Sequence, residues 1–374
     1  EVTSIDHDAH TVQVVDLATG TEFTDRYDTL VLATGARSVV PPLPGVDAPG
    51  VFGVRNVGDA IAIRAWIRGR QATTAVVVGS GFIGLEMAEQ LVAAGLQVTL
   101  VEKAPQVMPA LDADMAFRVA EELGKHGVDV RPGVGVTAIH ASDRVTGVQL
   151  DHDEVLPADV VILAVGVRPE TTLARQIGVE LGTTGAIRVD QTMRTNLPGV
   201  YAVGDVAESY CLITGKPLWR PLGSTANKMG RIAGDAITGG GLSHRGIVGT
   251  GILRVFDLGV AHTGLTAREA RAEGFAVEVH HNIKPAHATY VGGRALVIKA
   301  VADRDTGRLL GAQVIGPQGV DKRIDVLATA ISFGAQVGDL FHLDLAYSPP
   351  FATTKDPVHY TGMALDNAIT GRAS

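Results

Sequence analysis

The sequence predicts an α/β protein with two Rossmann-like dinucleotide-binding domains, the first incomplete at its N-terminus, and a C-terminal α+β domain. Three observations lead to this prediction. One pattern of strands occurs twice, a glycine-rich turn opens a helix directly after an apolar strand, and alternating strands dominate the chain after Gly246. A length of 374 residues is sufficient for two or three domains.

The composition excludes several classes of protein. Hydrophobic residues make up 46% and charged residues 19%, so the chain is neither disordered nor fibrous. The net charge of −8 argues against nucleic acid or an anionic membrane surface as the main partner, and no apolar run could span a membrane. The single cysteine, Cys211, excludes an internal disulfide framework. We expect a cytoplasmic protein with no metal site.

The repeated pattern consists of short alternating strands followed by an apolar strand that ends at a glycine. The first copy covers residues 2–37 and ends this strand at Thr34-Gly35, and the second covers residues 136–168 and ends it at Gly166. Two chance β-rich segments are the alternative. The second copy also has a front half that contains the glycine-rich turn. A first copy built alike would have its own turn upstream of Glu1, so we expect an N-terminally truncated chain.

The front half of the second copy has the order that a GxGxxG dinucleotide motif requires. Its segments are a strand at residues 74–78, the turn at 79–84, a helix at 85–94, a strand at 97–101 and then Glu102. Gly79 permits the tight turn, Gly81 lets the backbone approach a pyrophosphate, and Gly84 lets the helix pack on the sheet. The helix N-terminus adds N–H donors for an anion. We therefore predict a dinucleotide site here.

Residues around this turn indicate which dinucleotide is bound. Glu102 can accept hydrogen bonds from both hydroxyls of an adenosine ribose and would repel a 2′-phosphate, which favours NADH over NADPH. Lys103 beside it leaves NADPH possible. Phe82, Ile83 and Glu86 at the start of the helix are further candidates for cofactor binding, as is Gly166 at the end of the second copy's apolar strand. For Glu86 the alternative is a solvated surface carboxylate.

A second group of candidates lies in the segments that flank the second copy. The run at residues 195–205 is a turn and a short apolar strand that delivers Asp205 at its end, where the carboxylate can hold sugar-alcohol hydroxyls. A capping role for Asp205 is the alternative. Thr34-Gly35 similarly lets a phosphate-bearing chain pass close to the backbone. The helix expected at residues 224–237 has its N-terminus free to face an anionic or electron-rich ligand edge.

Together these motifs resemble the pyridine nucleotide-disulfide oxidoreductase family, and within it the coenzyme A disulfide reductase and NADH oxidase/peroxidase branch. The matching residues are 32–35, 79–86, 195–205, 344–351 and 355–357. The resemblance implies that FAD is bound by Thr34, Gly35, Gly204, Asp205, Leu222 and Asn227. It also implies that Phe82 is the gate ring over the flavin, displaced when the nicotinamide enters.

The C-terminal domain is expected to be an antiparallel sheet covered by helices. Strands are predicted at residues 252–256, 276–280, 295–299 and 311–315, and helices at 323–333 and 357–369. In the resembling family this domain forms a homodimer interface. The resemblance therefore implies that Tyr347 faces the partner's substrate pocket, that Tyr290 donates a proton, and that Lys355 and His287 contact substrate. A structural tyrosine and a solvated lysine are the alternative.

The expected domains are an FAD domain at residues 1–70 and 190–245, an NAD(P)H domain at 71–189 and a dimerisation domain at 246–370. The resemblance implies an enzyme that passes hydride from NAD(P)H through flavin to a redox cysteine, which reduces coenzyme A disulfide. We expect that cysteine to be absent from this chain, because Cys211 has the context of an ordinary thiol. The alternatives are an NADH oxidase or peroxidase reducing O2 or H2O2, a flavin reductase serving a small redox protein, and a non-catalytic NADH-binding redox sensor.

Overall fold

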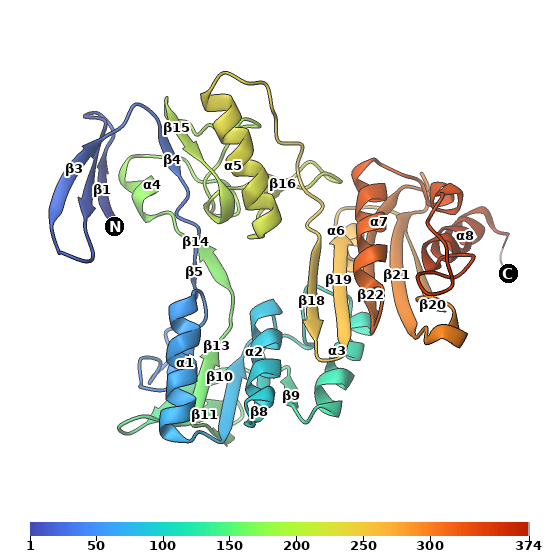
Figure 1. Cartoon of the computed structure of the whole chain (residues 1–374), viewed down its shortest axis with the longest axis horizontal. Helices are drawn as coiled ribbons and strands as arrows, with labels where there is room; N and C mark the ends of the chain where they lie inside the picture. The colour runs from blue at the N-terminus through green and yellow to red at the C-terminus, as the bar shows by residue number, and fades with distance from the viewer. Residues whose placement is uncertain (373–374) are drawn as a thin grey trace. The chain divides into compact units, whose positions relative to one another are not determined.

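The computed structural model describes residues 1–372, which form two compact units (Figure 1). The first unit contains Glu1–Arg37 and Val167–Ile247, and the second contains Ser38–Gly166 and the chain from Val248 onward. The chain therefore leaves the first unit after Arg37, before the boundary expected at residue 70. It returns to this unit at Val167, before the boundary expected at residue 190. The reason is that β6 (Val51–Gly53) pairs in parallel with β13 (Val160–Leu163) and so belongs to the sheet of the second unit.

The first unit combines an antiparallel sheet with a short parallel pair of strands. Its elements are β1 (Val2–Asp6), β2 (Thr11–Val15), β3 (Glu22–Arg26), β4 (Leu30–Leu32), α4 (Thr172–Gln176), β15 (Val200–Ala202), η1 (Gly204–Val206), β16 (Ser209–Tyr210), β17 (Pro217–Leu218) and α5 (Gly223–Ile237). The antiparallel order is β1-β2-β3, and β4 pairs in parallel with β15. Leu32, Ala202 and Met229 share one apolar core, so α5 packs on this pair. The short strands β5 (Ala36–Ser38) and β14 (Val167–Pro169) stand where the chain passes between the units.

The second unit begins with a parallel sheet and its helices. The elements are β6, α1 (Val57–Arg70), β7 (Thr74–Val78), α2 (Phe82–Ala93), β8 (Gln97–Glu102), α3 (Ala113–Lys125), β9 (Asp129–Pro132), β10 (Val136–Ala141), β11 (Val145–Leu150), β12 (Val155–Pro157) and β13. The sheet order is β6-β13-β7-β8-β9, with a small β10-β11-β12 sheet beside it. Strands β7 and β13 are almost wholly buried, as expected for apolar strands in the middle of a parallel sheet.

The two copies of the repeat have the same arrangement. In each, a three-stranded antiparallel sheet precedes an apolar strand that pairs in parallel, β4 with β15 in one copy and β13 with β6 in the other. The difference is that β13 also pairs with β7 on its other edge, whereas β4 has no such neighbour among residues 1–372. An open hollow of about 760 Å³ runs beside β4 and β1 instead.

The rest of the second unit is a five-stranded antiparallel sheet of order β18-β19-β22-β21-β20. Its elements are β18 (Gly251–Val255), β19 (Leu258–Gly264), α6 (Ala267–Ala272), β20 (Val277–Pro285), η2 (Thr289–Val291), β21 (Ala295–Asp303), β22 (Leu309–Gly316), α7 (Val320–Ser332), η3 (Val337–His342) and α8 (Pro357–Thr370). The sequence predicted four of the five strands and missed β19, because its two glycines, Gly259 and Gly264, weaken the strand pattern. None of the helices in residues 1–372 is long and apolar enough to cross a membrane.

Candidate functional site

The glycine-rich turn of the second unit joins β7 to α2 at the carboxyl edge of the parallel sheet. Gly79 has a φ of +101°, and a Cβ on it would lie 2.4 Å from the carbonyl oxygen of Ala164 at the end of β13. A Cβ on Gly84 would lie 1.9 Å from the carbonyl oxygen of Gly79, whereas Gly81 faces open space. Among residues 1–372, no side chain caps the N-terminus of α2. The turn can therefore bring backbone N–H groups close to an anionic ligand.

The carboxylate of Glu102 is fixed beside this turn. Its Oε2 accepts hydrogen bonds from the backbone N–H and the Oγ of Ser80, at 2.8 and 2.6 Å, and its Oε1 accepts from Ala104 N–H at 2.7 Å. Ser80 is fully buried and also accepts from Met108 N–H. Sequence analysis missed Ser80 and Met108, because nothing in their local pattern indicates this contact. Lys103 is exposed.

The Phe82 ring opens α2 and packs on the sheet of the C-terminal domain. It lies edge-on to His262 with ring centroids 5.9 Å apart, and a Cβ on Gly251 would come within 2.8 Å of it. Gly251 thus provides the space that the ring occupies, a contact no local pattern could indicate. Ile83 is half-buried. Glu86 is exposed and lines a separate groove that includes Ile252, Arg294 and Gly319.

In the first unit, the candidate residues gather where β4 and β15 end, because parallel strands place their carboxyl ends at the same edge of a sheet. Thr34 and Gly35 follow β4. The Oγ1 of Thr34 donates to the carbonyl of Glu170 at 2.6 Å, and Gly35 has a φ of +73°. Gly204 and Asp205 follow β15, and Gly204 has a φ of +76°.

Helix α5 begins beside this edge. A Cβ on Gly204 would lie 3.5 Å from the Cβ of Ala226 on α5. The carbonyl of Asp205 accepts a hydrogen bond from the indole N–H of Trp219 at 2.8 Å. Leu222 precedes the helix with no side-chain cap, and Asn227 is exposed on it. The first unit therefore joins Thr34, Gly35, Gly204, Asp205, Leu222 and the start of α5 in one region.

The C-terminal candidates surround a buried arginine that sequence analysis did not single out. Arg323 is 2% exposed, and its guanidinium pairs with Asp356 at 2.8 Å and donates to the carbonyls of Ala286 and Gly319. Asp356 also caps the N-terminus of α8. Arg323 thus ties together segments that lie far apart in the sequence, including the residues that precede His287 and follow Lys355.

His287, Tyr290 and Tyr347 come from two neighbouring loops. Ala288 N–H donates to the carbonyl of Pro349 at 3.1 Å, which brings the loop of His287 and Tyr290 beside that of Tyr347. Tyr290 and Tyr347 are 77% and 52% exposed. The Nδ1 of His287 is buried and has no hydrogen-bond partner in the described part of the chain. Such an atom is costly to bury, so it is a candidate for contact with a ligand.

Two lysines make cation–π contacts with the ring of Tyr360 on α8. The ammonium groups of Lys284 and Lys355 lie 4.4 and 5.2 Å from its centroid. No ion pair joins either lysine to a carboxylate among residues 1–372. Two cations held together without a counter-charge attract an anionic group. Lys284 was not predicted, because its place beside Lys355 depends on the packing of α8 against β20.

Comparisons with known proteins identify the family of this chain. The family model described as pyridine nucleotide-disulphide oxidoreductase matches residues 1–229, and its dimerisation-domain model matches residues 252–357. The chain belongs to the pyridine nucleotide-disulphide oxidoreductase family. The resemblance predicted from the sequence is therefore confirmed, as are the α/β fold and the C-terminal dimerisation domain. The family is one of enzymes, so the expectation that this chain is an oxidoreductase is also confirmed.

Several named proteins are similar in sequence to this pyridine nucleotide-disulphide oxidoreductase. An NAD(P)H sulfur oxidoreductase (CoA-dependent) from Pyrococcus furiosus is 40% identical over 91% of the chain and 76% of its own length. A coenzyme A disulfide reductase from Staphylococcus aureus is 30% identical over 97% of the chain and 81% of its own length.

Solved structures show the same likeness. The reduced CoADR-RHD of Bacillus anthracis superposes with a TM-score of 0.96 at 39% identity, over 99% of this chain and 67% of that one. The NADH-bound, water-forming NADH oxidase of Lactobacillus brevis has a TM-score of 0.92 at 26% identity, over 100% and 83% of the two chains.

Proposed function

We propose that this oxidoreductase passes hydride from NADH through FAD to a redox cysteine that reduces coenzyme A disulfide. The observation that carries the proposal is the glycine turn of Gly79, Gly81 and Gly84 with the carboxylate of Glu102 fixed beside it. The open space at Gly81 and the uncapped start of α2 fit a pyrophosphate, and Glu102 fits the hydroxyls of an unphosphorylated ribose. NADPH is the less favoured donor, because Glu102 would repel its 2′-phosphate.

The first unit supports FAD as the second cofactor. Gly35 and Gly204 have the positive φ angles that turn the backbone at the ends of β4 and β15, and Asp205 can hold hydroxyls there. The start of α5 directs N–H groups toward the same region. The unit carries no GxGxxG sequence of its own. We infer that the free edge of β4 takes up a strand equivalent to β7, whose following turn would hold the pyrophosphate.

The chemistry divides between the cofactor and the chain. When bound, FAD supplies a ring that accepts hydride and passes on electrons. In this chain, Phe82 would be the ring displaced when the nicotinamide enters, and Thr34 and Asp205 would orient the cofactor. Cys211 is buried and is the single cysteine, so we place the redox cysteine outside these 374 residues.

The C-terminal cluster supports coenzyme A disulfide as the acceptor. Lys355 and Lys284 offer two positive charges to phosphate groups, and Tyr347 and Tyr290 hold protons at their hydroxyls for a departing thiolate. Both tyrosines are exposed in the single chain, which fits a homodimer in which each subunit contributes them to the partner's site. The printed names of the relatives from P. furiosus and S. aureus also include coenzyme A. We place the enzyme in the cytoplasm, where its single thiol stays reduced.

A second candidate function is reduction of O2 or H2O2 by NADH. It is favoured by likeness to an NADH oxidase of Methanocaldococcus jannaschii, which is 36% identical over 99% of this chain and 82% of its own length.

The test compares acceptors in the protein carried by the complete gene. We expect a yellow dimer that oxidises NADH fastest with coenzyme A disulfide and slowly with O2 or H2O2. Faster turnover with O2 or H2O2 would favour the oxidase or peroxidase. NADH binding without turnover on any acceptor would support the non-catalytic redox sensor instead of an enzyme. A colourless protein would exclude FAD.

A further inference from the structure

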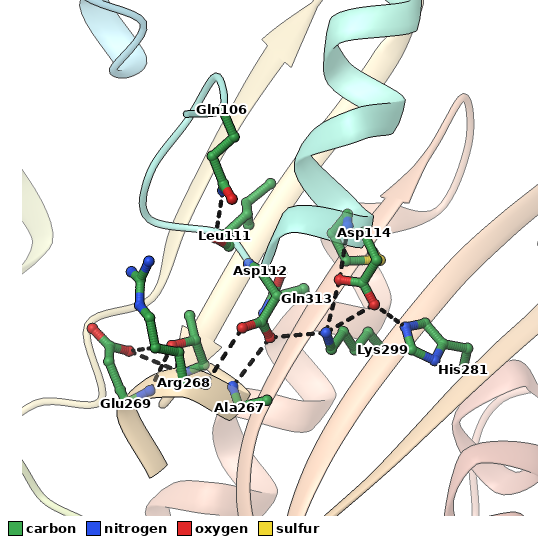
Figure 2. Close-up of polar contacts among 12 residues, drawn as sticks. Gln106, Leu111, Asp112, Asp114, Ala267, Arg268, Glu269, His281, Lys299 and Gln313 are labelled. Carbon is green, nitrogen blue, oxygen red and sulfur yellow. Dashed lines mark hydrogen bonds and ion pairs between the residues drawn. The ribbon is translucent and has the colours of Figure 1, made fainter. Parts of the chain in front are cut away.

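A polar cluster, buried at Lys299 and Gln313 and partly exposed at Asp114 and His281, fastens the start of α3 to the antiparallel sheet, within the second unit (Figure 2). Lys299 of β21 is 5% exposed, and its ammonium lies 3.0 Å from a carboxylate oxygen of Asp112 and 2.7 Å from one of Asp114. Asp114 also pairs with His281 of β20. The amide of Gln313, on β22, completes the cluster. Its Nε2 donates to the Asp112 carboxylate at 2.8 Å, and its Oε1 accepts from Asp112 N–H at 3.0 Å.

The carboxylate of Asp112 is turned away from its own helix. Asp112 is the N-cap of α3, yet its side chain makes no capping hydrogen bond there. It accepts instead from Ala267 N–H at the start of α6, as well as from Lys299 and Gln313. An aspartate at this position ordinarily satisfies the first N–H groups of its own helix. The cluster therefore holds Asp112, the residue at which the preceding loop ends and α3 begins, against the antiparallel sheet.

That preceding loop, residues 103–112, connects Asp112 to the nucleotide turn. It starts directly after Glu102 and is held to the turn by Met108, whose N–H lies 3.1 Å from both the carbonyl oxygen and the Oγ of Ser80. Leu111 N–H donates to the Met108 carbonyl, and both side chains are fully buried. The Ser80 Oγ in turn donates to Glu102. Direct contacts thus run without interruption from Lys299 to the carboxylate expected to hold the ribose.

We propose that Lys299 and Gln313 are positioning residues for the pyridine nucleotide. By holding Asp112 on the antiparallel sheet, they set where Met108 meets Ser80 and so keep the Glu102 carboxylate and the turn aligned for NADH. The proposal rests on the proposed function, because it takes this turn as the NADH site. It assigns a role in nucleotide affinity to residues of the C-terminal domain, none of which lies on the turn itself.

The test uses the full chain with the variants Lys299→Met and Gln313→Met. Gln313→Met leaves the Lys299 ion pairs in place, so it keeps the proposal testable if the unpaired carboxylates of Lys299→Met prevent folding. Lys125→Met is the matched control, because it also removes a lysine charge from an ion pair, that of the exposed Lys125 with the buried Glu122, at the other end of α3. Dissociation constants for NADH are measured by titration well below every variant's melting temperature, and amide hydrogen exchange is followed in residues 103–112.

We expect both variants to raise the dissociation constant for NADH roughly fivefold or more. Exchange at the amides of Met108 and Leu111 should become faster in both, and Lys125→Met should match the wild type. A lowered melting temperature with unchanged NADH affinity and unchanged exchange would overturn the proposal, since that is the result of a purely structural cluster. Wild-type protein that shows no saturable NADH binding would instead overturn the proposed function, and the positioning role with it.

Discussion

Ser80 and Glu102 are joined by two hydrogen bonds to one carboxylate oxygen, from the backbone N–H at 2.8 Å and from Oγ at 2.6 Å. These two hydrogen bonds connect the glycine-rich turn to the end of the neighbouring strand β8. Because Ser80 is fully buried, this carboxylate cannot swing freely into solvent. If Glu102 binds the ribose as proposed, its carboxylate is in position before a nucleotide arrives, which lowers the entropy cost of binding.

Replacing Gly84 with alanine should destabilise the second unit, because the new Cβ would lie 1.9 Å from the Gly79 carbonyl oxygen. Overpacking of this kind costs about 1–3 kcal/mol. Gly81→Ala is the matched control, since a Cβ there meets nothing within 4 Å and should leave the melting temperature unchanged. It should nevertheless weaken NADH binding, because the methyl group enters the space of the pyrophosphate. Thermal unfolding and NADH titration check both effects, and equal melting temperatures would contradict the first.

Removal of the Glu102 carboxylate should reduce the preference for NADH. Glu102→Ala loses the acceptor for the ribose hydroxyls and also frees Ser80, so we expect the dissociation constant for NADH to rise about tenfold or more. The dissociation constant for NADPH should change less or fall, since the repulsion of its 2′-phosphate disappears. Parallel titrations with both nucleotides give the ratio. An unchanged ratio would mean that Glu102 does not contact the ribose.

Replacing the lysines beside the Tyr360 ring distinguishes coenzyme A disulfide from O2 as the electron acceptor. In the complete enzyme, Lys355→Met and Lys284→Met should each raise KM for coenzyme A disulfide about fivefold, because each removes one charge-assisted contact with phosphate. The rate with O2 should stay the same, since O2 carries no charge. Lys125→Met serves as the control for loss of a positive charge. If KM for coenzyme A disulfide does not change in either variant, these lysines do not bind the acceptor.

Acid should unfold the second unit partly through Asp112 and Asp114. Burial alone would raise the pKa of both carboxyls, but hydrogen bonds from the Ala267 N–H to Asp112 and from Lys299 to both hold each pKa below its usual value. The unfolded-state pKa is about 3.9, so their stabilisation is complete above about pH 4 and is lost as the pH falls through the lower folded-state values.

The free energy of unfolding, measured by denaturant titration between about pH 6 and pH 3, should therefore fall below about pH 4. Lys299→Met should show a smaller fall, because it lacks the charge that lowers both pKa values. Identical pH profiles for the variant and the wild type would show that Lys299 does not stabilise the ionised carboxylates.

The sequence by itself determined the local elements and the family. Apolar runs identified β7 and β13, the spacing of Gly79, Gly81 and Gly84 identified the turn, and the repeat predicted that both copies share one arrangement. These features depend on residues close together in the chain, so periodicity and spacing are sufficient to find them.

Only the tertiary structure decided which distant side chains meet. The sequence predicts only that a helix begins at Arg323. In the structure this side chain is buried, pairs with Asp356 and donates to the carbonyl of Ala286, so it connects the loop of Tyr347 to that of His287. Lys299 likewise stands in an apolar strand and pairs with Asp112 across the second unit. A charge becomes stable in the interior only through partners brought to it by folding, and such partners leave no local pattern in the sequence.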